Sequence, residues 1–149
     1  IALGLKHDGQ GHRVFTLLWD VELAEGSSWE ALMSASHYKR DNLVIIVDRN
    51  TLQITGGTEE VMGLEPLADR FVAFGCAVRV CNGNDVQDLV NTLDDLPFES
   101  GKPSLVIAQT IKGKGVSFME NTVRWHHKVP NDAEYQTALD ELAQLEAML

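Results

Sequence analysis

Apolar residues fall into short and long blocks that alternate along the chain. The short blocks are rich in apolar and β-branched residues without strict alternation, which is typical of strands covered on both faces. They are residues 13–18, 43–47, 76–81 and 104–110. The longer blocks place apolar side chains at helical spacing. They are residues 27–39, 66–74, 85–96 and a final helix after Asn131, while residues 1–6 indicate the end of a further helix.

Polar residues at the expected helix starts have the spacing of capping boxes. The pairs are Ser27 with Glu30, Asn84 with Gln87, and Asn131 with Glu134. The first of these helices should turn a mostly apolar face inward, formed by Trp29, Leu32, Met33 and Ser36. The last helix has one apolar stripe, which we expect to dock on the body of the domain or on a partner. The stripe is Tyr135, Leu139, Leu142, Leu145 and Leu149.

The strand, helix and strand of residues 13–47 form a crossover unit. Such units leave both strands parallel, with their carboxyl ends at one edge of the sheet. The order of elements therefore predicts a three-layer α/β domain with a mainly parallel sheet, and 149 residues fit a single domain. Ligands of open α/β sheets bind at the carboxyl edge.

Two oxygen-bearing side chains follow neighbouring strands at that edge. Asp20 comes after the first strand and Asn50 after the second, so we expect them to lie side by side. Carboxylate and amide oxygens suit Mg²⁺, which takes its remaining ligands from phosphate and water. The alternative is that Asp20 caps a turn and Asn50 tolerates a left-handed backbone. Residues 51–63 should form a surface loop nearby, with an acidic pair at Glu59 and Glu60.

A second glycine-rich segment follows the last strand at the same edge. Lys112 and Lys114 alternate with glycines in Ile-Lys-Gly-Lys-Gly, and such a loop can hold phosphate, although a solvated basic turn is equally consistent with it. Residues 116–128 would form a flap over the edge. In the flap, His126 and His127 should point apart on an extended backbone, and a histidine there is either ordinary surface or a donor near phosphate.

Composition excludes several classes of protein. The net charge of −10 and pI near 4.8 argue against a nucleic-acid surface, and no run approaches the ~20 apolar residues of a membrane span. Cys76 and Cys81 are five residues apart in one predicted strand, so they should face opposite sides of the sheet. Two unpaired thiols suit a reducing compartment, and we expect a cytoplasmic protein.

Three segments together resemble one enzyme family. WDVELAEGSSWEALMSASHYKRDNLVIIVDRNTLQITG is similar to the thiamine diphosphate motif of transketolases. GTEEVMGLEPLADRFVAFG and TIKGKGVSFMENTVRWHHKVPN resemble the separately encoded amino-terminal half of a two-chain transketolase. The resemblance implies the diphosphate-binding domain of that family, without a long upstream portion that the family carries.

The resemblance also implies ligands and chemistry. Mg²⁺ would be held by Asp20, Asn50 and the backbone carbonyl of Leu52. The implied contacts of thiamine diphosphate are Asp20, Val21, Glu22, Asn50, Leu52, Ile54, Lys112 and His126. His126 would also act on the substrate, and Glu25 lies where the family contacts its pyrimidine-binding domain.

The implied reaction is transfer of a two-carbon ketol unit between sugar phosphates. It requires a partner chain with the pyrimidine-binding domain, because the glutamate that activates the cofactor is in that domain. The isolated chain should therefore be inactive, and a homo- or hetero-oligomer should be the working form.

One departure from the family keeps other functions open. Trp19 and Val21 flank Asp20 where the family has glycines, and glycine lets the backbone approach a phosphate closely. If Asp20 continues the strand, both side chains point away from it, whereas a positive φ at Val21 would add strain. A non-catalytic interaction module that has lost the cofactor is one alternative. A relative of deoxyxylulose phosphate synthase is another.

Overall fold

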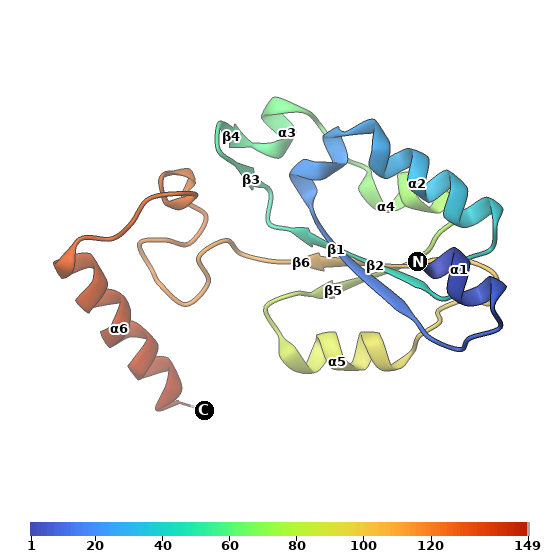
Figure 1. Ribbon diagram of the computed structural model, residues 1–149. Coiled ribbons are helices and arrows are strands. Elements are labelled where there is room, and N and C mark those ends of the chain that lie inside the picture. Colours follow the sequence, from blue (N-terminus) through green and yellow to red (C-terminus); the bar gives the residue numbers. More distant parts are fainter. Residues whose placement is uncertain (149) are drawn as a thin grey trace.

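Four parallel strands form the centre of the molecule. The computed structural model describes residues 1–148. Its strands are β1 (Val14–Trp19), β2 (Leu43–Arg49), β5 (Ala77–Asn82) and β6 (Ser104–Gln109), in the sheet order β1-β2-β6-β5. All three pairings are parallel, so the four carboxyl ends lie at one edge (Figure 1).

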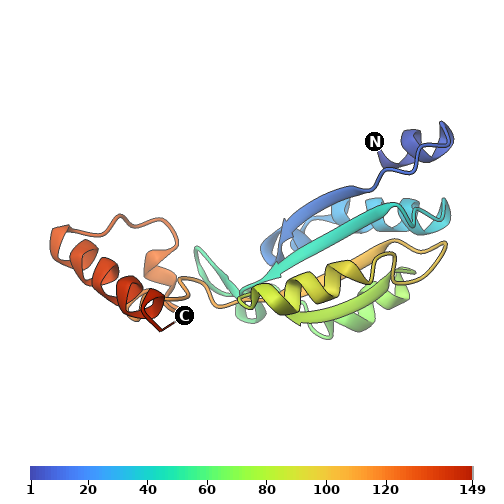
Figure 2. The ribbon, with the colours of Figure 1, turned by 90° about the horizontal axis from the view of Figure 1, so that it is seen from below.

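Helices cover the two faces of this sheet. Helices α2 (Gly26–His37) and α4 (Leu67–Ala73) lie on one face, and α5 (Val86–Asp94) lies on the other (Figures 1 and 2). The short helix α1 (Ala2–His7) precedes β1. The predicted three-layer α/β fold with a parallel sheet is confirmed.

The strand register separates two apolar layers. Ile45 pairs with Leu105 and Val47 with Ile107, and these side chains belong to the layer under α2 and α4, around the fully buried Phe71. Trp29 of α2 stacks on Phe71 with ring centroids 5.3 Å apart. The other layer lies under α5 and contains Val106, Ala108 and Cys81.

The two cysteines belong to different layers, as predicted. Cys76 packs in the cluster under α2 and α4, whereas Cys81 packs under α5. Both thiols are free and buried. Burial raises the pKa of the Cys76 thiol to about 11, so this group behaves as an apolar core side chain.

Two of the three predicted capping boxes are wrong. Helix α2 has Glu25 at its N-cap position without a side-chain bond, so Ser27 does not cap it. Helix α5 is capped by Asp85, which accepts bonds from two backbone N–H groups, because Asn84 instead accepts a 2.7 Å bond from the Ile111 N–H. The inward direction predicted for Met33 is also wrong, since Met33 is exposed.

The segment predicted as a loop after Asn50 has regular structure. Strands β3 (Leu52–Gln53) and β4 (Gly56–Gly57) form a small antiparallel hairpin, and α3 (Thr58–Val61) follows it. The Thr58 N–H donates to the Thr51 carbonyl at 2.9 Å. The hairpin and α3 lie beside the carboxyl end of β2 (Figure 1).

Helix α6 (Asp132–Glu146) lies away from the sheet (Figures 1 and 2). Its capping box of Asn131 and Glu134 is present as predicted. The apolar stripe does not dock on the sheet layers, because Tyr135, Leu139, Leu142 and Leu145 are all exposed, while Leu149 is outside the described residues. The helix contacts the preceding segment instead, where Glu141 accepts a 2.6 Å bond from the Ser117 N–H.

No helix within residues 1–148 combines the length and the apolar character needed to cross a membrane.

Candidate functional site

Asp20 and Asn50 lie at adjoining strand ends. Trp19 is paired with Asp48 in the β1–β2 register, which places the next residue, Asp20, beside the end of β2. The Oδ2 atom of Asp20 accepts bonds from the Thr51 N–H at 2.7 Å and from Arg49 Nη1 at 3.0 Å. These donors flank Asn50 in the sequence, so the prediction that the two ends are neighbours is confirmed.

The backbone at Asp20 does not continue the strand. Strand β1 ends at Trp19, and Asp20 begins the 3-10 helix η1 (Asp20–Ala24). Trp19 has an extended backbone with φ of −86°, and Val21 is not among the residues with positive φ in the described chain. Val21 therefore carries no backbone strain from a positive φ.

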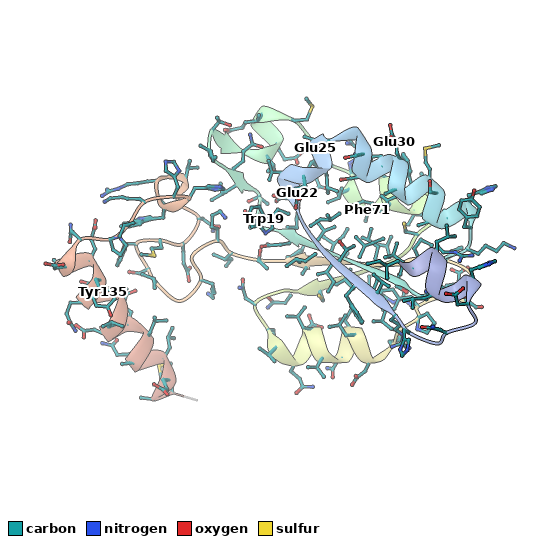
Figure 3. The ribbon with its side chains drawn as sticks, in the orientation of Figure 1. Trp19, Glu22, Glu25, Glu30, Phe71 and Tyr135 are labelled. Carbon is teal, nitrogen blue, oxygen red and sulfur yellow. The ribbon has the colours of Figure 1, made fainter. Side chains whose placement is uncertain are left out.

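The Trp19 side chain points to the α5 side of the sheet. Its strand partner Asp48 is in register with Ala108, which packs in the layer under α5, and paired residues share a face. The indole is 56% exposed, whereas Asp20 is completely buried. Figure 3 shows Trp19 at the end of β1 near Glu22, whose Oε2 accepts a 2.7 Å bond from the Trp19 N–H. The indole is therefore not buried against the Asp20 carboxylate.

Backbone strain does occur close to the site, at Thr51. This β-branched residue has φ of +67°, a left-handed conformation that costs about 1 to 3 kcal/mol. Two bonds hold it there: its N–H donates to Asp20, and its carbonyl accepts from Thr58. The left-handed turn aims the Thr51 N–H at the Asp20 carboxylate.

Asn50 is fixed by bonds within its own turn. It is buried, its Oδ1 accepts a 3.1 Å bond from the Leu52 N–H, and its Nδ2 donates to Asp48 Oδ1 at 3.4 Å. Asp48 Oδ1 also accepts a bond from the Thr110 hydroxyl at the end of β6. The amide is therefore oriented by two neighbouring strands, and its carbonyl oxygen keeps a second lone pair.

The residues present fit a divalent cation. Asp20 Oδ1 is buried without a hydrogen-bond partner, and a buried carboxylate oxygen requires one. Within the described residues no group of three or more histidines, cysteines or carboxylates converges on one point. A metal here would therefore depend on Asp20, the Asn50 amide, a backbone carbonyl and external phosphate oxygens, a set that suits Mg²⁺.

Arg49 is a member of this site that the sequence did not indicate. It is 6% exposed at the end of β2 and donates to Asp20, Thr58, Glu59 and Glu65. Burial acts to lower the pKa of Arg49, but hydrogen bonds to Glu65 and Asp20 outweigh it, and the pKa lies above its usual value. The pKa of Glu59 is lowered, chiefly by its bond from the Leu64 N–H.

Lys112 and His126 belong to the segment that leads from β6 to α6. The Lys112 carbonyl accepts a 3.0 Å bond from the Asn121 N–H, which closes the 112–121 loop. His126 does not have the predicted extended backbone, because it ends the 3-10 turn η2 (Val123–Trp125) with φ of −59° and ψ of −34°. Its Nδ1 is buried without a partner. Burial lowers the pKa of His126, and the charges of Lys112 and His127 lower it further.

The Trp125 side chain packs against other residues of this segment. Its ring lies 5.2 Å from the ring of Phe118, and Lys128 Nζ lies 4.5 Å from its centroid. Cation and ring interact favourably at this separation. The segment predicted as a flap, residues 116–128, thus packs its own side chains against one another.

A cleft occupies the other half of the carboxyl edge. It has a volume of about 880 Å³ and lies between the ends of β5 and β6 and the start of α5. Asn84, Thr110 and Lys114 are among the residues that line it. The glycine-rich loop thus borders the cleft on the side of the sheet away from β1.

The family model for the transketolase thiamine diphosphate-binding domain matches residues 6–143. The chain belongs to this family. The transketolase match thus spans the strands, the Asp20 site and most of α6.

Relatives in the family include proteins named as transketolase subunits. An apulose-4-phosphate transketolase subunit of Actinobacillus succinogenes is 45% identical over 142 residues, which are 95% of this chain and 51% of that protein. The 6-deoxy-6-sulfo-D-fructose transketolase subunit SqwG of a Clostridium species is 35% identical over 95% of this chain and 52% of that protein. The chain thus spans about half the length of these relatives.

Solved structures agree with the sequence match. Transketolase of Campylobacter jejuni superposes with a TM-score of 0.75 and 25% identity, over 99% of this chain and 27% of that one. Transketolase of Leishmania mexicana gives a TM-score of 0.72 and 22% identity, over 99% and 26%. The fold is therefore that of the transketolase diphosphate-binding domain.

The remaining predicted residues lie around the edge of the site. Glu22 and Glu25 line a groove of about 350 Å³ between β1 and α2, and Figure 3 shows them on the same side as Glu30 of α2. Ile54 lies in the turn of the β3–β4 hairpin and is exposed. These three residues lie at the surface, apart from the buried Asp20 and Asn50.

Proposed function

We propose that this chain is the thiamine diphosphate-binding part of a two-chain transketolase, which transfers a two-carbon ketol unit between sugar phosphates. Membership of the family supports binding of the cofactor. The similar proteins that are named as one subunit of a transketolase support the existence of a partner chain. In this proposal the partner supplies the pyrimidine-binding domain, and the isolated chain is inactive.

The observation that carries the proposal is the unpartnered Oδ1 atom of Asp20. Arg49 is surrounded by three carboxylates, so the surroundings are negative and would repel a bare diphosphate. A cation bound between Asp20 and the diphosphate reverses that repulsion. In this role Asp20, Asn50 and the Leu52 carbonyl hold Mg²⁺.

Other residues have roles toward the cofactor and substrate in this proposal. Bound thiamine diphosphate supplies a nucleophilic carbon and an electron sink. Lys112 contributes positive charge near phosphate, and His126, kept neutral by its lowered pKa, can accept or donate a proton at its imidazole. In this proposal the cofactor also contacts Val21 and Glu22 of η1 and Ile54 of the β3–β4 hairpin.

A non-catalytic module is the second candidate, and the residues that favour it are Trp19 and Val21. Both occupy glycine positions of the family motif, and their side chains reduce access of a phosphate to the backbone. A protein of this kind would keep the fold and the partner contact without the cofactor.

Calorimetric titration separates the two candidates. Thiamine diphosphate with Mg²⁺ is titrated into the full protein with its partner chain, and transfer between sugar phosphates is assayed in the same sample. We expect binding and turnover in the wild type, and loss of measurable binding in Asp20→Asn, because the amide oxygen carries no net charge for the metal. The matched control is Asp69→Asn on the exposed side of α4, which should bind normally.

If titration of the cofactor and Mg²⁺ into the wild-type complex produces no heat of binding, the result favours the non-catalytic module. In that case the double variant Trp19→Gly, Val21→Gly tests whether the two side chains are the obstacle, since restored binding would assign the loss to them. Thermal melts of each variant exclude unfolding as the cause, which matters because Asp20→Asn weakens a buried ion pair.

A further inference from the structure

Helix α6 is fastened to the segment before it along one side. Glu141 accepts two bonds from Ser117, one from the backbone N–H at 2.6 Å and one from the hydroxyl. Glu134 accepts bonds from Lys128 Nζ and Arg124 Nη2, each at 3.2 Å. The two glutamates are seven residues apart, which is about two helical turns, so both lie on the same side of α6.

The apolar stripe of α6 lies next to this bonded side and is poorly covered. Ala138 is buried, but each larger side chain of the stripe within residues 1–148 is at least 41% exposed. These residues are Tyr135, Leu139, Leu142 and Leu145. The helix extends away from the sheet (Figures 1 and 2), so the sheet layers of the same chain do not cover the stripe. An exposed apolar surface of this kind is typical of an interaction site.

The charges on α6 all have the same sign. Residues 132–146 include five carboxylates and no lysine or arginine. Asp132, Asp140 and Glu146 form no ion pair with any other residue that the structure describes. Glu146 lies in the last turn, where the helix dipole disfavours negative charge. Cations on a covering surface would compensate these carboxylates.

The charge also limits which surface can cover the stripe. A second copy placed stripe to stripe would bring five carboxylates against five, and each chain has a net charge of −10. Like charges that face each other across an interface oppose association. The surface that fits is therefore an apolar groove with lysine or arginine side chains along its rim. The similar proteins that are named as transketolase subunits support the existence of another chain that could carry it.

We propose that α6 is the docking helix for the partner chain, and that the partner receives it in an apolar groove rimmed by lysine or arginine. An amphipathic helix in a groove is anchored by apolar side chains at positions i, i+4 and i+7. Tyr135, Leu139 and Leu142 have this spacing. The inference rests on the proposed function, because it locates the contact with the partner that this function requires.

The first test removes the central anchor. The purified partner chain is titrated into the full protein by calorimetry, with thiamine diphosphate and Mg²⁺ present. We expect Leu139→Ser to lower the affinity for the partner at least about tenfold, as for truncation of other buried anchors at interfaces. The matched control is Val72→Ser, at an exposed apolar residue of α4, which should bind the partner as the wild type does.

The second test removes charge beside the stripe. The double variant Asp140→Asn, Glu146→Gln should bind the partner about 3- to 10-fold more weakly at low salt and show a smaller dependence on salt, because charges across an interface steer association. The control is Asp94→Asn, Asp95→Asn at the end of α5. It removes the same charge from another exposed part of the chain and should change neither quantity.

Weaker binding in both α6 variants and in neither control supports the inference. Unchanged binding in Leu139→Ser overturns it, and unchanged binding in the charge variant overturns the cationic rim. A lower melting temperature of Leu139→Ser without the partner also counts against it, because the stripe would then be covered by the same chain. Loss of self-association in that variant, measured by sedimentation, would make a second copy the occupant and so refute it.

These results leave the proposed function intact, because cofactor binding and turnover are measured separately on the wild-type complex. A wild-type protein that binds the cofactor and catalyses transfer without any partner contradicts both the partner chain and this inference. A wild-type protein that binds the partner through α6 but binds no cofactor supports this inference and favours the non-catalytic module.

Discussion

Asp20 and His126 share one property, a buried polar atom without a partner in the protein. Burying such an atom costs free energy, so both groups are prepared for an external partner. In the proposed function the partner of Asp20 is a cation, and the partner of His126 is a phosphate or a substrate hydroxyl.

The pKa of His126 gives a direct test at the residue scale. Its folded value lies below 6.5 because of burial and the charge of Lys112. As pH falls below 6.5 the unfolded chain takes up a proton before the folded chain does, so stability is lost between 6.5 and the folded pKa. We expect Lys112→Gln to raise the pKa and to reduce this loss, with NMR titration of the histidine ring as the measurement.

Lys114→Gln is the control for that experiment. Lys114 pairs with Glu120 at 3.3 Å and is not a cause of the His126 shift. An equal rise in both variants would show that overall charge, and not the position of Lys112, sets the pKa.

The sequence predicted Asp20 and Asn50 but not Arg49. The first two follow from the rule that parallel strands end at one edge. Arg49 was not predicted because its partner Glu59 belongs to the segment predicted as a loop, and Glu65 lies between that loop and the next predicted helix. Contacts across 10 and 16 residues are not visible in periodicity. The available signal was a pair of charged residues, Asp48 and Arg49, directly after an apolar run and followed by a stretch with several acids.

At the scale of elements, the positions of the helices could be predicted, but two of the three predicted N-caps are wrong. Burial fixes the apolar period, whereas a cap depends on which of several adjacent polar residues has the required backbone. Asp85 and Asn84 are both suitable by type, and the chain uses Asn84 to hold the loop after β6.

The junction between α4 and β5 depends on Gly75. Its φ is +85°, and a Cβ atom there would lie 2.1 Å from Ser36 Oγ of α2. We expect Gly75→Ala to lower the free energy of unfolding by more than the ~1 to 2 kcal/mol of a left-handed alanine, because the Ser36 side chain of α2 must move as well. Chemical denaturation measures the difference.

Gly101→Ala isolates the backbone contribution. Gly101 has φ of +81°, but a Cβ there would meet only Lys39 Cδ, at 4.0 Å. If both alanine variants lose the same free energy of unfolding, the contact with Ser36 of α2 adds nothing to the backbone cost.

At the scale of the whole molecule, the free energy of folding should reside in the layered sheet and not in α6. Phe71 of α4 is fully buried, whereas Tyr135 of α6 is 55% exposed (Figure 3). Phe71→Ala should lower the free energy of unfolding by about 3 to 5 kcal/mol. Tyr135→Ala should change it by about 0.5 kcal/mol or less, as measured by denaturant unfolding at low protein concentration.

A large loss in Tyr135→Ala would contradict this division and show that the α6 stripe is covered in solution. The predicted capping box of α6 is confirmed. Hydrophobic periodicity identifies an apolar face and not what lies against it, so docking of the stripe on a partner stays a prediction.

The central claim is that Asp20 and Asn50 hold a metal at the carboxyl edge of the sheet. Its most direct test is anomalous scattering from crystals of the full protein with thiamine diphosphate and Mn²⁺, which takes the same oxygen ligands as Mg²⁺. The predicted result is an anomalous peak bonded to Asp20 Oδ1 and the Asn50 side-chain oxygen, with Arg49 still on Oδ2. A cofactor bound with its metal peak away from Asp20 would contradict the account.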